Sequence, residues 1–428
     1  MCELPGKAPP NRGLSWLLIA ALLVGCAGPN PSRSERQPER NQMNVLDQML
    51  LALPEAHAPL IAEAEQFRTQ ILLTEIVNTD GRPTLRRHRF RVDAEYFFPA
   101  SSIKLMPAVA AMELVSKGGT LAGAIEAPLR FAAILDGARA VVQDAVEHNP
   151  SNSPTGLITI AHDVWTLCIV SDNEAYNRLF ELVGRNELSA RLAEWGLTQT
   201  RVVHRLSRRV PPPFQGASPR IEIGGEPPVV LAARNGDGPM PEVRITRPLV
   251  GEAVMRGNAR VEGPLDFSNH NATSLSDLQN LLIAVTRPDI RDPAVPVVNL
   301  DDERRTDLLR AMTAYPREST NPVYDPANYP DEYVKFLLPG VARVIPKERV
   351  RIVNKVGLAY GFLTENAYIE DVATGRGFFL AATVYVNSDR VLNDDAYDYD
   401  TVGLPFLEAL GEAAARLLLG DPSSRQDR

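Results

Sequence analysis

Cysteine is scarce in this 428-residue chain, which contains only Cys2, Cys26 and Cys168, far apart in the sequence. This number and spacing exclude a disulfide framework and do not match a zinc site. A dense stripe of lysine and arginine is also lacking, and the net charge is −8. We therefore expect no nucleic-acid partner. No motif for a cofactor is present either, so neither a cofactor nor a metal is expected.

Long apolar runs are few. Near the N-terminus, residues 16–24 are continuously apolar, which is too short to span a bilayer comfortably. Lys7 and Arg12 precede this run, as in a secretory signal peptide. The run ends in Gly25-Cys26, which resembles a bacterial lipobox, where the cysteine is lipidated and becomes the new N-terminus. The alternative is an ordinary signal peptide with an incidental cysteine.

The lipobox interpretation predicts an exported, lipid-anchored protein. Residues 1–25 would be the signal peptide, and residues 26–42, rich in Pro, Ser and Arg, a flexible tether. Ala27 favours the periplasmic face of the outer membrane in a bacterium with two membranes. Cys168 would remain as the only thiol, and its apolar neighbours predict a core position.

The remaining residues, 43–428, contain enough apolar side chains for a core, since 44% of the whole chain is hydrophobic. Within them, residues 205–271 are rich in Pro, Gly and Arg and are interpreted as an insertion with short strands such as 229–231 and 243–246. Periodicity predicts further elements in the order helix, strands, helices, strands, helix. They are a helix from about Asn44, strands 71–77 and 88–92 joined by an Asp80-Gly81 turn, helices from Ser101 to about 195, 274–285 and 301–314, strands 350–355, 362–370 and 378–386, and a helix 402–419.

This order predicts an α+β fold. Strands at both ends of the domain can pair only within one antiparallel sheet, with helices on its faces and an all-helical lobe beside it. A cleft between sheet and lobe would be the natural position for a site. We expect a monomer.

Ser101 and Lys104 form a Ser-x-x-Lys pair at the start of a predicted helix. Positions three apart share a helix face, so the hydroxyl and the amine can meet. A serine needs a base to act as a nucleophile, and a buried lysine with a lowered pKa can serve. The alternative is a capping serine with a surface lysine. However, Ile103, Leu105 and Met106 surround Lys104 with apolar residues, which a surface lysine does not need.

Two other polar motifs follow apolar runs. Ser171-Asp172-Asn173 comes directly after four apolar residues, which suggests that a buried segment presents these polar side chains to a cleft. The alternative is that the triplet caps a helix. Lys355-Val356-Gly357 ends a predicted strand, where a lysine could attract a carboxylate and a glycine could let substrate approach. A strand ending in a turn is the alternative.

Together, the three motifs resemble those of class A β-lactamases and penicillin-binding proteins, in the same order. The resemblance extends over about residues 43–419, and it implies the fold of these serine hydrolases. Further segments fall where the family has counterparts, namely 180–184, 196–201 and 338–340.

The resemblance implies a role for each matched residue. Ser101 would attack a carbonyl to form an acyl-enzyme, with Lys104 as general base and Ser171 as proton relay. Backbone N–H groups of Ser101 and Leu358 would form the oxyanion hole. Asn173 would bind the substrate amide and brace Lys104, while Lys355 would attract the substrate carboxylate.

Two departures from the family pattern concern turnover. The loop that carries the deacylating glutamate in these β-lactamases has Leu206 at the matched position. Val356 replaces the usual Thr or Ser between Lys355 and Gly357. His204, Glu222 or Glu226 could supply a base instead.

Other polar residues are expected to be structural. His162 and Asp163 are expected to cap or pack, and the acidic run 393–400 to be a solvated loop rather than a calcium site.

The leading hypothesis is a serine hydrolase acting on β-lactams, on D-Ala-D-Ala peptides of the cell wall, or on another ester or amide. The alternatives are a non-hydrolysing lipoprotein that binds penicillin or peptidoglycan, and a purely structural anchor.

Overall fold

A computed structural model describes residues 43–136, 139–140, 146–208 and 210–420. The predicted signal peptide, Cys26 and the tether lie outside the described residues. Within the described ranges, no helix is long and apolar enough to cross a membrane.

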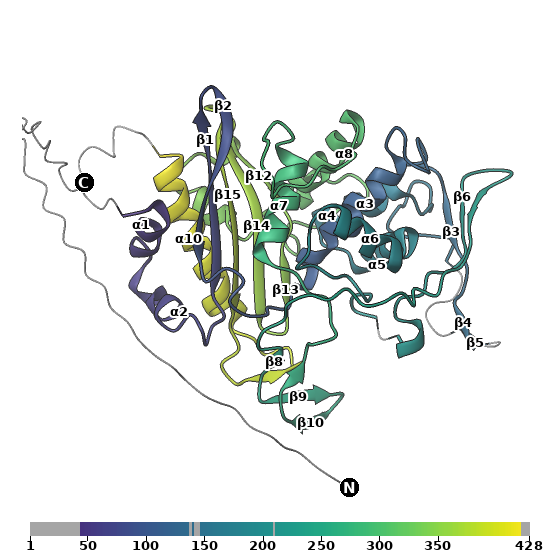
Figure 1. The fold of residues 1–428 in the computed structure, drawn as a ribbon, viewed down its shortest axis with the longest axis horizontal. Coiled ribbons are helices and arrows are strands. Elements are labelled where there is room, and N and C mark those ends of the chain that lie inside the picture. Colours follow the sequence, from purple (N-terminus) through teal and green to yellow (C-terminus); the bar gives the residue numbers. More distant parts are fainter. Residues whose placement is uncertain (1–42, 137–138, 141–145, 209, 421–428) are drawn as a thin grey trace, which may run out of the picture. The chain divides into compact units, whose positions relative to one another are not determined.

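The core of the fold is one antiparallel sheet of six strands, and it joins the two ends of the domain as predicted (Figure 1). The N-terminal strand β1 pairs with the late strand β15, which confirms the predicted α+β architecture. The strand order is β12-β14-β15-β1-β2, and β13 pairs with β14 beyond the end of β12. The bounds are β1 Gln70–Thr79, β2 Arg82–Phe90, β12 Val350–Asn354, β13 Gly357–Ala359, β14 Phe362–Asp371 and β15 Arg376–Tyr385.

The first hairpin has the predicted turn. Asp80 and Gly81 have φ values of 51° and 77°, the left-handed pair required by the two-residue turn that matches the strand twist.

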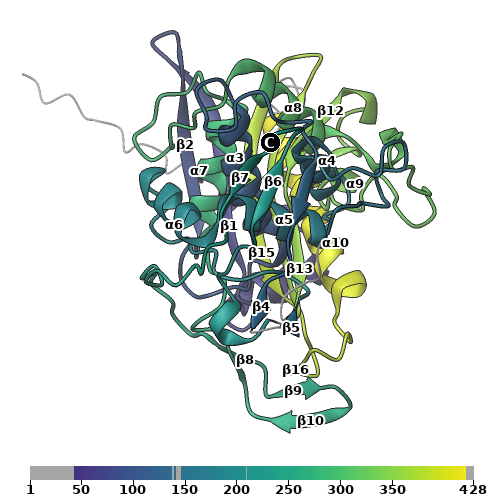
Figure 2. The ribbon, with the colours of Figure 1, turned by 90° about the vertical axis from the view of Figure 1, so that its right-hand side faces the viewer.

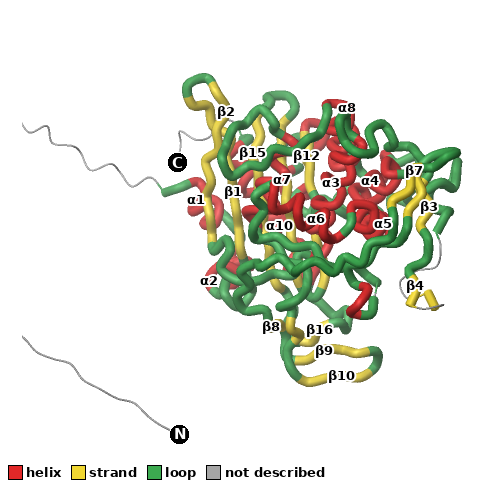
Figure 3. The backbone as a smooth tube through the Cα atoms, turned by 45° about the vertical axis from the view of Figure 1, so that its right-hand side comes forward, coloured by secondary structure: helices red, strands yellow, loops and turns green. Residues whose placement is uncertain are grey.

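Helices cover both faces of the sheet (Figures 1 and 3). On one face, α10 (Leu404–Leu418) packs with α1 (Val45–Leu51) and α9 (Leu338–Val341), around a cluster of apolar side chains that includes Phe406 and Leu380. A π-helical turn, Tyr399–Gly403, leads into α10. The short helix α2 (Ala58–Ala62) precedes β1.

On the other face, α7 (Leu275–Thr286) packs against β1, β14 and β15 and separates the sheet from the helical lobe. The lobe contains α3 (Leu105–Val115), α4 (Ile160–Ile169), α5 (Asn173–Val183), α6 (Arg185–Glu194) and α8 (Asp302–Thr313). Side chains of Thr159, Asp172, Ser274 and Asp301 accept hydrogen bonds from backbone N–H groups at the starts of α4, α5, α7 and α8.

The segment 205–271 forms short strands, of which β8, β9 and β10 extend from one end of the sheet (Figures 1 and 2). The predicted strand 243–246 was wrong, because this segment forms no ladder with another strand. Its backbone bonds instead to Tyr96 N, through Thr246 O, and to the Gln199 side chain, through Arg244 N. Ile221 and Phe267 belong to the same apolar cluster as the lobe. The minor strands are β3 Leu129–Phe131, β4 Leu135–Asp136, β5 Arg139–Ala140, β6 Ile221–Ile223, β7 Val229–Leu231, β8 Leu249–Val250, β9 Ala253–Arg256, β10 Ala259–Glu262, β11 Leu265–Asp266 and β16 Val391–Leu392.

Candidate active site

Ser101 lies in a turn of 3-10 helix, Ala100–Lys104, that leads directly into α3. In a 3-10 helix, residues three apart are eclipsed, so Ser101 and Lys104 share a face as predicted, although by a tighter helix. Ser101 is half-buried, whereas Lys104 is completely buried. Ala100 has a φ of 45°, an uncommon conformation for a residue with a side chain and one often found at functional sites.

The amine of Lys104 is surrounded by acceptors from the Ser171-Asp172-Asn173 segment. Nζ lies 2.7 Å from Asn173 Oδ1, 3.3 Å from Ser171 Oγ and 3.3 Å from the carbonyl oxygen of Asp172, and it also donates to the carbonyl oxygen of Ser171. The predicted contact between Lys104 and Ser171 is therefore present. The expected contact between Ser101 and Lys104, in contrast, was not found, because among the described residues no hydrogen bond joins the Ser101 hydroxyl to Lys104.

The surroundings of Lys104 favour its neutral amine. Burial holds the pKa of Lys104 well below its usual value, and the nearby Lys355 cation lowers it further, while Asp172 opposes the shift. A neutral amine can accept a proton, so Lys104 has the environment that a general base requires.

Lys355 approaches the same hydroxyl from the sheet. Its Nζ donates to Ser171 Oγ at 2.8 Å and to the carbonyl oxygen of Val356 at 3.1 Å. Burial lowers the pKa of Lys355 to about 8, so the ammonium form predominates at neutral pH. Because Ser171 Oγ accepts from Lys355, its own proton remains available to a third partner. Ser171 is held with a φ of 61°.

Gly357 brings the strand into backbone contact with the turn that carries the nucleophile. A Cβ atom at this position would lie 2.3 Å from the carbonyl oxygen of Pro99 and 3.2 Å from the backbone nitrogen of Ser101. Glycine is therefore required here by close approach. The side chain of Val356, in contrast, is buried in the apolar cluster on the α10 side of the sheet.

The backbone N–H of Leu358 points away from the sheet. The N–H of Lys355 donates to Asn366 O at 3.1 Å, and the same register continues through β13. In an antiparallel ladder, alternate residues direct their N–H groups to the partner strand, so Gly357 bonds to β14 and Leu358 does not. Leu358 therefore presents an N–H at the edge of the sheet, next to the residue that touches Ser101.

The loop expected to carry a deacylating residue reaches the site through Ser207. Asn173 Nδ2 donates to Ser207 Oγ at 2.8 Å, whereas Leu206 is buried and its backbone is bonded on both sides to the Asn177 side chain. The next residue, Arg208, pairs with Glu174. In the described part of the chain, no carboxylate bonds to Lys104, Ser171 or Lys355.

The alternative bases have other contacts. His204 Nδ1 lies 2.7 Å from Arg205 O and its Nε2 accepts from Asn271 N, while burial lowers the pKa of His204 to about 4. Glu222 lies on β6 and pairs with Arg220, which directly precedes this strand. Glu226 is exposed in the loop that follows β6.

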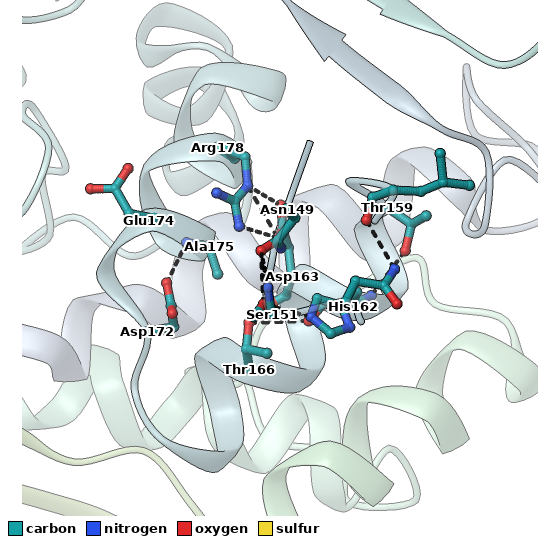
Figure 4. Close-up of polar contacts among 12 residues, drawn as sticks. Asn149, Ser151, Thr159, His162, Asp163, Thr166, Asp172, Glu174, Ala175 and Arg178 are labelled. Atoms are coloured by element: carbon teal, nitrogen blue, oxygen red, sulfur yellow. Dashed lines mark hydrogen bonds and ion pairs between the residues drawn. The ribbon is translucent and has the colours of Figure 1, made fainter. Parts of the chain in front are cut away.

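His162 and Asp163 stabilise the lobe, as expected (Figure 4). Asp163 is fully buried and accepts several hydrogen bonds from Arg178, the shortest 2.6 Å. His162 Nε2 lies 2.9 Å from Ser151 Oγ. Figure 4 also shows Asp172 capping α5 through Ala175 N, at 2.7 Å.

A buried polar network beneath Lys355 was missed by sequence reasoning. Lys335 Nζ donates to Asn354 Oδ1 at 3.0 Å, and Asn354 Nδ2 donates to Glu365 Oε1 at 2.8 Å. Burial lowers the pKa of Lys335 to about 8 and raises that of Glu365 to about 7. Since Asn354 directly precedes Lys355, this network anchors the strand end that presents the cation. Lys335, like Lys104, lies in an apolar run, and that signal could have revealed it.

Metal-ligand clusters of His, Cys, Asp and Glu are absent from the described ranges. In the acidic run 393–400, Asp394 accepts from Ala396 N and Asp398 from Ser388 N. Cys168 is a buried free thiol, and burial raises its pKa to about 12.

The sequence model of one protein family, described as the beta-lactamase enzyme family, matches residues 60–295, more than half of the chain. The match includes Ser101, Lys104 and Ser171 and ends before Lys355. Curated proteins gave no match.

Solved structures similar to the chain include three β-lactamases. The one from Xanthomonas campestris pv. campestris is 16% identical, with a TM-score of 0.48, over 88% of this chain and 99% of its own. The one from Desulfarculus baarsii is 16% identical, with a TM-score of 0.46, over 86% and 98%. The one from Burkholderia vietnamiensis is 14% identical, with a TM-score of 0.46, over 85% and 97%.

Proposed function

The chain belongs to the beta-lactamase enzyme family, and we propose that it is a serine hydrolase that acts through an acyl-enzyme on Ser101. The observation that carries the proposal is the environment of Lys104, a completely buried amine that contacts both Ser171 and Asn173. Burial together with the neighbouring Lys355 cation holds the pKa of Lys104 well below its usual value, and a neutral lysine beside a serine can act as an acylation base.

The proposed reaction uses the groups in sequence. Lys104 takes the Ser101 proton, directly or through water, as Oγ attacks the carbonyl carbon. The N–H groups of Ser101 and Leu358 stabilise the resulting oxyanion. Ser171 then gives its proton to the leaving nitrogen and regains one from the Lys104 ammonium, to which its hydroxyl is bonded. The C–N bond breaks and the acyl group remains on Ser101.

The substrate we propose is a β-lactam or a D-Ala-D-Ala-like amide. Both carry a carboxylate near the scissile amide, and the Lys355 ammonium beside Ser171 suits such a group. Asn173 Nδ2 has a second hydrogen that could bind a substrate carbonyl. The alternatives are an esterase or amidase with another substrate, and a lipoprotein that binds penicillin or peptidoglycan without hydrolysing it. The lack of a carboxylate hydrogen-bonded to the described site groups is the observation that favours slow hydrolysis.

Labelling with a fluorescent penicillin tests the proposal. Mass spectrometry of the labelled peptide should place the adduct on Ser101. Ser101→Ala should abolish labelling and leave thermal unfolding nearly unchanged, since only a half-buried Oγ is removed. Ser189→Ala is the matched control, because the Ser189 hydroxyl donates to the Arg185 carbonyl oxygen within its own helix. Persistent labelling of the Ser101 variant would overturn the assignment.

We also propose that the protein is exported and held on a membrane by lipid on Cys26. The support is the sequence alone, in which the apolar run 16–24 ends in Gly25-Cys26. An active site for cell-wall or β-lactam substrates would suit that location.

A further inference from the structure

The Lys104 amine, the Asn173 carboxamide and the Ser207 hydroxyl form a continuous chain of hydrogen bonds. Lys104 Nζ lies 2.7 Å from Asn173 Oδ1, and Asn173 Nδ2 lies 2.8 Å from Ser207 Oγ. We propose that Ser207 is a positioning residue that holds the Asn173 carboxamide in place, and through it the protonation and placement of Lys104. This inference rests on the proposed function of the site.

The carboxamide has two orientations that differ by exchange of its oxygen and nitrogen. Lys104 in its ammonium form can only donate, so it requires the oxygen on its side. The neutral amine can also accept, and it therefore discriminates less between the two orientations. In the orientation that the Lys104 ammonium requires, Ser207 Oγ accepts from Nδ2 and holds the other end of the carboxamide in place.

The backbone around Ser207 is built to deliver this hydroxyl. The preceding residue, Leu206, is buried, and the Asn177 side chain bonds both its N–H, at 3.0 Å, and its carbonyl, at 3.1 Å. Arg205 is buried in an ion pair with Glu181 at 2.6 Å. Ser207 itself has a φ of 52°, an unfavourable conformation for serine that the anchored loop imposes. Ser207 remains exposed, so its contact to Asn173 is not a by-product of core packing.

The orientation matters for substrate as well as for the base. With Nδ2 bonded to Ser207, its second hydrogen can be donated to a substrate carbonyl. In the reversed carboxamide, Oδ1 would take this place and repel the carbonyl oxygen. Without the Ser207 hydroxyl, this end of the carboxamide loses its hydrogen bond. We therefore expect slower acylation and a weaker hydrogen bond from the Lys104 ammonium to Asn173 Oδ1.

The experiment measures the Lys104 pKa directly. The chain has only six lysines, so ¹³C-lysine NMR of the full-length protein gives few signals, and the Lys104 signal is assigned by its loss in Lys104→Ala. Lys355 and Asp172 are the charged groups whose fields act on Lys104, and neither is changed in the Ser207 variants. Ser207→Ala should lower the Lys104 pKa by about 0.5 or more, because a charge-assisted hydrogen bond is weakened. The second-order rate of acylation by fluorescent penicillin should fall about tenfold.

Three further variants separate the effect of losing the Ser207 hydroxyl from the effect of the strained backbone at this position. Ser207→Gly removes the hydroxyl and relieves the positive φ, and it should give the same shift as Ser207→Ala. Ser207→Asn tolerates positive φ and restores an acceptor, and it should recover both the pKa and the rate. Ser189→Ala removes a hydroxyl that donates to the Arg185 carbonyl oxygen within α6, and it should change neither.

An unchanged Lys104 pKa in both the Ala and Gly variants would overturn the assignment of Ser207. A shifted pKa in a protein that no penicillin labels would leave the Ser207 assignment standing and remove the proposed substrate class instead. Normal labelling with no effect of either Ser207 variant would remove the assignment of Ser207 and leave the proposed substrate class standing.

Discussion

Gly357 and Ser101 meet through backbone atoms, with a Cβ at position 357 falling 3.2 Å from the Ser101 nitrogen. This contact joins a strand near the C-terminal end of the domain to the turn that carries the nucleophile. The nearest obstacle to any side chain is the Pro99 carbonyl oxygen, which cannot rotate away as a flexible side chain could. Placement of the proposed oxyanion hole therefore depends on the absence of a single methyl group.

Gly357→Ala should displace the Ser101 turn. We expect acylation by fluorescent penicillin to slow by about 100-fold, because small displacements of reacting groups have effects of this size. The free energy of unfolding should fall by about 1–3 kcal/mol, as for overpacked sites. Gly225→Ala is the matched control, since nothing lies near a Cβ there. Wild-type acylation by the Gly357 variant would contradict the proposed contact.

The rate of acylation should depend on pH through both lysines. Lys104 must be neutral, so the rate should rise with pH through its lowered pKa. Lys355 must be charged to bind the carboxylate, and its ammonium is present below its pKa of about 8 and lost above it, so the rate should fall above that pH. In Lys355→Arg, the guanidinium stays charged and the descending limb should disappear. Lys347→Arg, at a surface ion pair with Asp331, should leave the profile unchanged. Persistence of the descending limb in Lys355→Arg would assign it to another group.

Turnover of β-lactams should be slow. The groups that acylation needs are present in the site. Deacylation also needs a base that activates water opposite the ester. None of the carboxylates in the described ranges is hydrogen-bonded to Lys104, Ser171 or Lys355, so none of them is placed to act as that base. Loss of a positioned base typically costs about 10²–10⁴-fold. Stopped-flow hydrolysis of a chromogenic cephalosporin should therefore show one burst followed by near-stoichiometric inhibition. Sustained hydrolysis at about 10 per second or faster would reveal a base not recognised in this site.

Cys26→Ser should release the protein from membranes. A lipidated cysteine with an additional N-acyl chain gives stable anchoring, and the substitution removes the attachment point. Fractionation of cells into soluble and membrane material, followed by immunoblotting, measures the result. Cys2→Ser is the control, because Cys2 lies within the predicted signal peptide. Membrane retention of the Cys26 variant would contradict the lipobox interpretation.

Features that depend on near neighbours in the chain could be read from the sequence. The Ser101–Lys104 spacing puts both side chains on one face of any right-handed helix, and the Asp80-Gly81 pair determines its own turn. Alternating and helical apolar patterns located most strands of the sheet and most helices to within a few residues. The strand predicted at 88–92 was misplaced, since β2 begins at Arg82, and the block predicted as helical from Ser101 to about 195 also contains the strand β3, Leu129–Phe131. The order of these elements also predicted that the two early and three late strands share one antiparallel sheet, since strands at both ends can pair only within such a sheet.

Contacts between distant residues were decided by the tertiary structure. Lys104 and Lys355 converge on Ser171 across sequence separations of 67 and 184 residues, and packing of the lobe against the sheet brings them together. The residue of the 200–208 loop that touches Asn173 is Ser207 rather than Leu206, because Asn177 fixes the loop register by bonding the Leu206 backbone. Such contacts between distant residues leave no periodic pattern in the sequence. The apolar run around Lys335 could have marked that lysine as buried, but its contact with Asn354, and the contact of Asn354 with Glu365, could not be predicted from the sequence.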